Sequence, residues 1–243
     1  MRAMVLAAGL GTRLRPLTND RPKALVELGG RTLLEITLTR LASSGVRDVI
    51  VNVHYFADQV IEYLHANNNF GLRVEISRED HLLLDTGGGL KKAAWFFLQD
   101  PARMDEPFLL HNVDIVSSID LARLLKFHDE GGALATLAVQ ERESSRQLLF
   151  TSNGELAGRW INGQDHEFAR PTPNLQAFAF SGIHVISPRL LPKITEEGVF
   201  SIIDTYLRLA REGGKILAFR ADEYFWRDLG RLEDLQEAER DIR

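Results

Sequence analysis

The sequence of 243 residues contains no cysteine. A disulfide framework and a thiolate metal site are therefore excluded, and the absence suits a cytoplasmic protein. No run of about eighteen apolar residues is present, so we expect no membrane-spanning helix and no membrane partner. Signal-peptide features are also missing, because the apolar residues 3–7 already predict a buried strand of the fold.

Positive charge is also in deficit relative to negative charge. The 29 lysines and arginines are outnumbered by 34 acidic residues, and the formal net charge is −5 at pH 7. Without a basic stripe, nucleic acid is not expected as a partner. Length and composition fit one large α/β domain or two small ones. Since no repeat, low-complexity tract or linker is visible, we predict one domain over 1–243, with two lobes, at about 1–135 and at about 136–243.

The cations that are present gather where the first predicted strand ends. Gly9 and Gly11 allow the backbone to take positive φ angles and to approach a ligand closely. Successive backbone N–H groups in such a turn form an anion-binding concavity. Thr12, Arg13 and Lys23 add a hydroxyl donor and two cations, so the segment predicts a site for polyphosphate.

Two common phosphate-binding loops do not match this segment. The dinucleotide fingerprint needs a third glycine where this chain has Leu14, and Pro16 follows closely. The P-loop needs Gly-Lys-Ser/Thr, which is absent. Pro16 and Pro22 predict a loop rather than a helix. A lone Gly-x-Gly is usually an ordinary tight turn, and the cations around it favour the phosphate site.

Hydrophobic patterns predict an alternation of strands and helices in the first half of the chain. The strands fall at 3–7, 48–53, 72–77 and 108–111, and the helices at 33–44, 57–67, 90–98 and 119–130. Such an alternation is typical of a Rossmann-like, doubly wound, mostly parallel α/β sheet with ligands at the carboxyl ends of the strands.

The pattern changes in the second half of the chain. Strands at 133–140, 148–151, 156–161 and 178–186, with a polar loop at 163–174, predict a small mixed β layer in the second lobe. Helices at 200–212 and 232–242 and strands at 216–220 and 224–226 complete the expected elements.

The pattern Gly9-x-Gly11-Thr12-Arg13, followed by Pro22-Lys23, resembles the signature of sugar-1-phosphate nucleotidyltransferases. The resemblance implies that the nucleotide is bound by the backbone and side chains of Ala7, Ala8, Gly9, Gly11, Thr12 and Arg13. It also implies two catalytic cations. Arg13 would hold the phosphates that leave as pyrophosphate, and Lys23 would bridge the α-phosphate and the incoming sugar phosphate.

Two aspartates are the candidate metal ligands. Asp114 follows the strand at 108–111, a position where aspartate also commonly forms a turn or caps a helix. Asp228 lies in a Trp-x-Asp-x-Gly sequence that resembles a late motif of the same family, in which two aspartates hold Mg²⁺. Mg²⁺ prefers few protein carboxylates together with phosphate oxygens and water. Asn112-x-Asp114 is also similar to the Asp-x-Asp of metal-dependent glycosyltransferases, which lack the Arg13 and Lys23 pair.

Two further segments resemble ligand-binding parts of the family. We predict that the triple-glycine segment is a loop in which Thr86, Gly87 and Gly88 bind the base and ribose, while Gly89 lies toward the sugar. The alternative is a flexible loop before the helix at 90–98. We expect Asn112 to contact both the nucleotide and the sugar.

On the sugar side we also predict Ser181 and Gly182, for which the alternative is a core strand with a bulge glycine. Residues 140–143 depart from the Glu-Lys-Pro of many family members, which puts the family's sugar contacts in doubt for this chain.

The resemblance implies an Mg²⁺-dependent enzyme that makes an NDP-sugar and pyrophosphate from an NTP and a sugar 1-phosphate. The short length of the chain is similar to that of the compact N-acetylmuramate-1-phosphate uridylyltransferases and of the small mannose- or heptose-1-phosphate guanylyltransferases. The Leu-Ala-Ala-Gly opening, the triple glycine and the segment 180–183 (Phe-Ser-Gly-Ile) favour the former, and so UTP and N-acetylmuramate 1-phosphate. The resemblance also implies that the lobe at about 1–135 is a nucleotide lobe and the lobe at about 136–243 a sugar-acceptor lobe. GTP with mannose or heptose 1-phosphate, as in the small mannose-1-phosphate guanylyltransferases, is the first alternative. A catalytically silent regulatory subunit that senses nucleotide sugars is the second. We expect a monomer or a homodimer.

Overall fold

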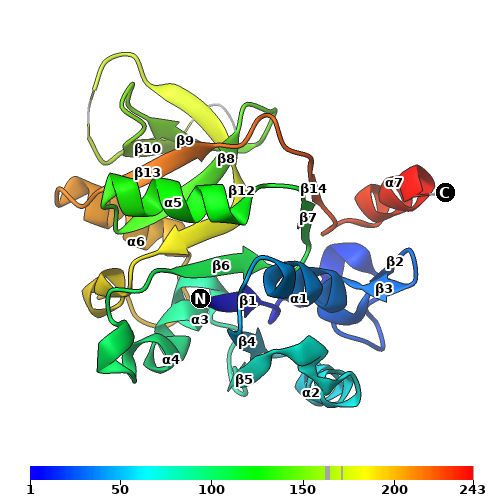
Figure 1. Cartoon of the computed structure of the whole chain (residues 1–243). Helices are drawn as coiled ribbons and strands as arrows, with labels where there is room; N and C mark the ends of the chain where they lie inside the picture. The colour runs from blue at the N-terminus through cyan, green and yellow to red at the C-terminus, as the bar shows by residue number, and fades with distance from the viewer. Residues whose placement is uncertain (162–164, 171, 243) are drawn as a thin grey trace.

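Strand β1 (Arg2–Leu6) lies inside a mixed sheet of ten strands that organises the whole chain (Figure 1). The structure is a computed structural model that describes residues 1–161, 165–170 and 172–242. The main path of the sheet runs β11-β10-β9-β12-β6-β1-β4-β5, and β8 and β13 extend it from β12. The other nine strands of this sheet are β4 (Asp48–Val53), β5 (Arg73–Arg78), β6 (Phe108–Asn112), β8 (Ala135–Gln140), β9 (Arg146–Phe150), β10 (Leu156–Ile161), β11 (Asp165–Phe168), β12 (Gln176–Ile186) and β13 (Ile216–Arg220).

The strands β5, β4, β1 and β6 are parallel neighbours. In this register Leu6 lies between Asn52 and Asn112, so the carboxyl ends of three strands meet at one edge. Beyond β6 the sheet becomes mixed, because β12 runs antiparallel to β6 and to β8, while β13 runs parallel to β8. The edge at which these carboxyl ends meet is thus formed by the parallel half of the sheet.

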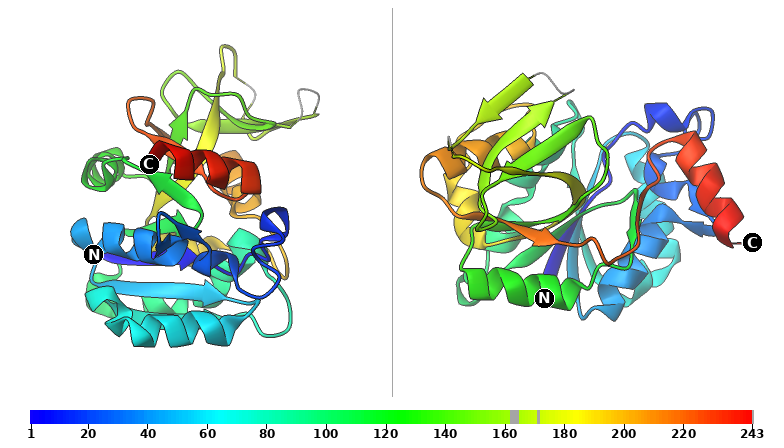
Figure 2. Two further views of the ribbon diagram at one scale, coloured as in Figure 1. Left: turned by 90° about the vertical axis from the view of Figure 1, so that its right-hand side faces the viewer. Right: turned by 90° about the horizontal axis from the view of Figure 1, so that it is seen from above.

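Helices cover both faces of the sheet, as a doubly wound fold requires. They are α1 (Leu33–Ser43), α2 (Ala57–Ala66), α3 (Asp85–Ala93), α4 (Trp95–Leu98), α5 (Leu121–Gly131), α6 (Ile202–Arg211) and α7 (Leu232–Ile242). On β1, Ala3 and Val5 belong to the core shared with α1, α2 and α5, whereas Met4 belongs to the core shared with α3, α4 and α6. The alternation of side chains along a strand therefore serves two separate apolar layers. Figure 2 gives two further views of this arrangement.

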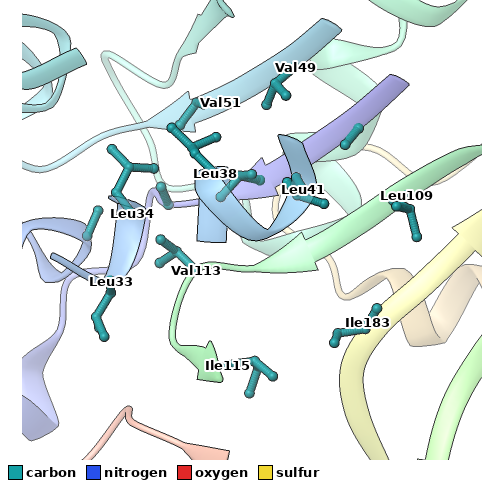
Figure 3. Close-up of a cluster of buried hydrophobic side chains, with 14 of the residues drawn as sticks. Leu33, Leu34, Leu38, Leu41, Val49, Val51, Leu109, Val113, Ile115 and Ile183 are labelled. Atoms are coloured by element: carbon teal, nitrogen blue, oxygen red, sulfur yellow. The ribbon is translucent and has the colours of Figure 1, made fainter. Parts of the chain in front are cut away.

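Helix α1 shows how sequence sets one of these layers. The hydroxyl of Thr32 accepts a hydrogen bond from the Glu35 amide and caps the helix start. Leu34, Leu38 and Leu41 follow at helical spacing and are fully buried against the parallel strands (Figure 3). Gly45, with a φ of 87°, allows the chain to turn away immediately after the helix.

The predicted fold class is confirmed, with corrections in detail. The expected triple-glycine loop is wrong, because residues 85–89 form the first turns of α3. The strands β9 to β11 do not form a separate layer, since the long strand β12 joins them to the central sheet. The expected loop at 163–174 contains β11, and its residues 163, 164 and 171 lie outside the described part of the chain.

Two short ribbons and several short 3₁₀ helices in the described residues were not predicted, and two of these helices lie in the glycine segment. The ribbons pair β2 (Glu27–Leu28) with β3 (Arg31–Thr32) and β7 (Ile115–Ser117) with β14 (Trp226–Asp228). The two 3₁₀ helices of the glycine segment are Thr12–Leu14 and Lys23–Leu25, where a loop was expected. Within the described residues, no helix combines the length and apolar character needed to cross a membrane.

Candidate active site

The β7–β14 ribbon brings the two candidate metal ligands together. Asp114 directly precedes β7, and Asp228 on β14 pairs in register with Ile115. The Leu229 amide also donates a hydrogen bond of 2.8 Å to the backbone oxygen of Asp114. Two aspartates from distant parts of the sequence are therefore fixed at neighbouring positions, at the carboxyl end of β6.

The surroundings of these carboxylates are strongly charged. Lys23 Nζ forms an ion pair with Asp114 Oδ2, and Asp114 is only 8% exposed. The Gly230 amide donates to Asp228 Oδ1 at 2.7 Å. Burial and the nearby Asp114 carboxylate raise the pKa of Asp228, while the Gly230 amide, Lys23 and Arg13 act in the opposite direction.

Gly230 lies between the charged side chains. A Cβ atom added there would be 2.8 Å from Asp228 Oδ1 and 3.0 Å from both Asp114 Oδ2 and Arg13 Nη2. The guanidinium of Arg13 is thus next to both carboxylates. The four residues predicted for catalysis and metal binding, Arg13, Lys23, Asp114 and Asp228, are brought to one place.

The two carboxylates fit a divalent cation such as Mg²⁺. They supply oxygen ligands, they are partly buried, and the Asp114 carboxylate raises the pKa of Asp228. Lys23 offsets part of that negative charge through its pair with Asp114. Among the described residues no group of three or more metal-ligating side chains occurs, so phosphate oxygens and water would have to supply the other ligands.

The glycine segment adopts, at Gly11, the positive φ that its sequence suggests. Gly11 has a φ of 64°, and an added Cβ would lie 2.9 Å from Thr18 Cγ2 and 3.1 Å from Lys23 Cβ. The Thr18 hydroxyl donates to the Gly11 oxygen at 2.8 Å, which holds the turn closed. Gly9, by contrast, has no atom within 4 Å of an added Cβ, so the space above it is open to a ligand.

A buried polar network supports the end of β1, and sequence reasoning missed it. The Ala7 amide donates to Asn52 Oδ1, and Asn52 Nδ2 donates to Glu79 Oε1, both at 2.7 Å. Glu79 Oε2 accepts the Leu84 amide at 2.8 Å. Asn52 and Glu79 are almost fully buried. The signal for them in the sequence is position alone: Asn52 is next to last in β4, and Glu79 directly follows β5.

The three glycines of α3 serve close packing. An added Cβ at Gly87 would lie 2.4 Å from the Phe200 ring, and one at Gly88 would lie 2.5 Å from the Gly198 oxygen. At Gly89 it would lie 2.9 Å from both Asn52 Nδ2 and Glu79 Oε1. These three helical positions are therefore glycine because neighbouring segments approach the helix too closely for a side chain. Because this packing is not visible in the local sequence, a loop was predicted where the structure has a helix.

The polar groups of this segment already have partners within the chain. The amides of Gly87 and Gly88 donate to the Phe200 oxygen at 3.0 and 3.4 Å. The Thr86 hydroxyl accepts the Ile202 amide at 3.0 Å and so caps α6. The segment connects α3 to α6 and borders the network around Asn52.

A pocket of about 500 Å³ adjoins the aspartates on the side of β9, β10 and β12. Asn112, Gly182 and Asp228 line it, and the first two are among the residues predicted for the sugar side. Gly182 has a φ of 71°, and an added Cβ would lie 2.9 Å from Asn112 Nδ2, so the glycine makes room for that side chain. The remaining lining residues are Ile115, Arg142, Ser144, Arg146, Gln147, Leu148, Arg159, Trp160, Ile161, Phe180, Ser201, Ile203 and Trp226.

Two predicted sugar-side residues lie outside this lining. Ser181 is fully buried, and its backbone oxygen accepts a hydrogen bond of 2.7 Å from Trp226 Nε1. Gly89 lies against the Asn52 network instead. The arginines and aromatic residues of the pocket were not predicted, because they come from strands that alternation alone cannot place around a common space.

A second hollow of about 510 Å³ lies between the segment 16–27 and α7. None of the predicted site residues lines it. The convergence of cations and carboxylates therefore identifies the pocket beside Asp228 as the one that adjoins the chemistry.

Several known proteins are similar to this chain over most of its length. Residues 2–149 match the nucleotidyl transferase family. The chain is 35% identical over 216 residues to an N-acetylmuramate alpha-1-phosphate uridylyltransferase of Caulobacter vibrioides, covering 87% of this chain and 85% of that protein. It is 30% identical to a mannose-1-phosphate guanyltransferase of Aspergillus fumigatus, covering 96% of this chain but 62% of that protein. A UTP–glucose-1-phosphate uridylyltransferase of Synechocystis is 28% identical, and this chain covers 63% of its length. The chain thus spans less than two thirds of these two longer relatives.

Solved structures share the fold at lower identity. HddC from Yersinia pseudotuberculosis is 22% identical and matches all of this chain and 99% of its own with a TM-score of 0.77. A Bacillus anthracis protein described as a glucose-1-phosphate thymidylyltransferase is 17% identical, with a TM-score of 0.80 over all of this chain and 96% of its own.

Proposed function

Because the chain belongs to the nucleotidyl transferase family, we propose that it transfers a nucleotidyl group from an NTP to a sugar 1-phosphate and releases pyrophosphate. The observation that carries this proposal is the convergence of Arg13, Lys23, Asp114 and Asp228 at the carboxyl end of the parallel strands. A sensor of nucleotide sugars would need the nucleotide pocket but not this set of charged groups.

The chemistry requires no general base. A phosphate oxygen of the sugar 1-phosphate is already ionised at neutral pH, so the protein has only to align it with the α-phosphorus and to stabilise charge. Arg13 would hold the β- and γ-phosphates, where negative charge accumulates as pyrophosphate leaves. Lys23 would exchange its contact with Asp114 for the α-phosphate and the sugar phosphate.

Asp114 and Asp228 would hold Mg²⁺, whose positive charge would stabilise the negative charge at the α-phosphate. Without that ion the mutual repulsion of the two carboxylates is only partly offset by Lys23 and Arg13. The open space above Gly9 would admit the phosphates close to the backbone. We assign Ala7, Ala8, Gly11 and Thr12 to the same nucleotide contacts, and the region of Thr86 to Gly88 to the base.

We propose UTP and N-acetylmuramate 1-phosphate as the substrates. The support is the uridylyltransferase relative, which matches at the higher identity and over most of its own length. GTP with mannose 1-phosphate is the second candidate, supported by the guanyltransferase relatives at 29–30% identity. The sugar would occupy the pocket beside Asp228, where Asn112 and Gly182 lie.

A substrate screen tests the proposal. The purified chain would be incubated with each of four NTPs and a panel of sugar 1-phosphates, and pyrophosphate release would be recorded with and without Mg²⁺. We expect release that needs both substrates and the metal, fastest with UTP and N-acetylmuramate 1-phosphate. Asp228→Asn is the matched inactive control. Nucleotide binding without release from any pair would instead support the silent sensor.

A further inference from the structure

The pocket beside Asp228 carries more positive charge than the chain itself neutralises. Arg142, Arg146 and Arg159 line it, whereas Asp228 is the only carboxylate among its described lining residues. We have assigned that carboxylate to the metal. Three arginines therefore lie around one cavity of a protein whose net charge is negative.

Only one of these arginines is paired with carboxylates. Arg159 donates to Asp204 at 2.6 Å and lies 2.8 Å from a carboxylate oxygen of Glu167. Within the part of the chain that the structure describes, neither Arg142 nor Arg146 has a carboxylate within 4.0 Å. Arg146 is exposed at the pocket edge, so water can solvate it. Arg142 is half-buried and cannot be solvated as freely.

Arg142 is held in place with most of its donors unused. Its guanidinium carbon lies 3.7 Å from the centre of the Trp226 ring, and Nη2 donates to the Phe180 oxygen at 2.8 Å. Its Nε is buried and has no hydrogen-bond partner among the described residues. A guanidinium carries five N–H donors in a rigid fork that matches a carboxylate. Burial lowers the pKa of Arg142 against the opposing effect of Asp228, as expected for a cation short of counter-charge.

The position of Arg142 separates it from the phosphate cations. Trp226 and Asp228 are two residues apart on β14, so their side chains lie on the same side of the strand. Arg142, stacked on Trp226, therefore lies near Asp228, and it lines the same pocket as Asn112 and Gly182, the pocket that we assign to the sugar. Arg13 and Lys23 come from the glycine segment and already serve the phosphates in the proposed reaction. The free donors of Arg142 adjoin a pocket walled by apolar residues that suit a sugar ring.

We propose that Arg142 binds an anionic group carried by the sugar itself, in addition to the 1-phosphate, and that it selects acidic sugar 1-phosphates over neutral ones. This inference rests on the proposed function. N-acetylmuramate carries a carboxylate on its lactyl ether, whereas N-acetylglucosamine lacks that group and is otherwise the same sugar. Mannose also lacks such a group. Arg142 is therefore the residue that decides between the candidate acceptors.

Kinetics with this matched pair of acceptors test the inference. The wild type, Arg142→Gln, Arg142→Lys and Arg159→Gln would be assayed with UTP and either N-acetylmuramate or N-acetylglucosamine 1-phosphate. We expect Arg142→Gln to lower kcat/KM for the acidic acceptor by about tenfold or more, the scale of one lost hydrogen bond to a charged group. The value for the neutral acceptor should change less than about twofold. Arg142→Lys should lie between, and Arg159→Gln should leave the ratio of the two acceptors unchanged.

The outcomes distinguish this inference from the proposed function. An equal loss with both acceptors would overturn it, because Arg142 would then serve the phosphates or the fold. A wild type that turns over neutral acceptors equally well would also overturn it, while nucleotidyl transfer itself would stand. If no pair of substrates gave pyrophosphate, the proposed function would fail. In that case calorimetry would give the Kd of each acceptor for the wild type and for Arg142→Gln. The ratio of the two Kd values would then decide the inference as the ratio of kcat/KM values does above.

Discussion

Replacement of Gly230 by alanine should separate activity from stability more cleanly than any other single change in this chain. The methyl group would enter the space between the three charged side chains, at 2.8 Å from Asp228 Oδ1 and 3.0 Å from Asp114 Oδ2 and Arg13 Nη2. Real Cβ atoms do not make contacts below 3.0 Å, so at least one of these groups must move. All three atoms are at the ends of flexible side chains, and the movement therefore costs little folding free energy.

The expected magnitude follows from that geometry. Displacing a catalytic group by about 1 Å can cost on the order of 10²-fold in rate. A shift of a few tenths of an ångström shared by two carboxylates and a guanidinium should lower kcat by roughly 10- to 100-fold. The free energy of unfolding should change by less than about 1 kcal/mol. Gly230 is not among the residues with positive φ, and an alanine at a compatible position also restricts the unfolded chain.

The assay combines steady-state pyrophosphate release with urea denaturation of the same preparation. We expect an intact unfolding midpoint with strongly reduced kcat and an increased Mg²⁺ requirement. Half or more of the wild-type activity would refute the reasoning, because the three side chains would then not need the space that Gly230 leaves. A large loss of stability would show instead that the ribbon itself depends on this glycine.

Three further changes probe other parts of the structure. Arg13→Lys should lower kcat by roughly 10²-fold, the scale of one preorganised transition-state donor, whereas Lys23→Ala should also raise KM for the sugar phosphate; identical kinetic changes would contradict the separate roles. Gly89→Ala should destabilise the fold by about 1–3 kcal/mol in urea denaturation, although alanine normally favours a helix, because the methyl would press on buried Asn52 and Glu79; a stabilised variant would contradict that packing. His184 is buried with its pKa lowered to about 3. Only the unfolded chain therefore takes up its proton below about pH 6.5, and the stability lost between pH 7.5 and 5 should be about 2 kcal/mol smaller in His184→Gln; an equal loss in both proteins would refute it.

The sequence allowed the elements of the parallel half to be predicted well, for a physical reason. Strands such as β4 and helices such as α1 carry unambiguous periodicity, and their boundaries were predicted to within a residue. The triple glycine misled because glycine is unfavourable in a helix when considered locally. In α3 its absence of a side chain is needed for packing against Phe200, Gly198 and the Asn52 network, which no local pattern reveals.

The same distinction between local and long-range information applies to the candidate site. Arg13, Lys23, Asp114 and Asp228 could be named from the sequence because short motifs carry them. The β7–β14 ribbon brings the two aspartates together, and Lys23 pairs with Asp114. Arg142 and the network of Asn52 and Glu79 could not be predicted. Their surroundings depend on strands that are distant in the sequence, and on a continuous sheet through β12 rather than on a separate layer.

Transfer of the α-phosphate tests the central claim most directly. UTP labelled with ³²P at the α-position would be incubated with N-acetylmuramate 1-phosphate, Mg²⁺ and the wild type or Asp114→Asn. With the wild type we predict that the label enters the nucleotide-sugar product in a one-to-one ratio with unlabelled pyrophosphate, and that Asp114→Asn forms almost none. Label that stays in UTP, or that is released as UMP without a sugar product, would contradict nucleotidyl transfer at this site.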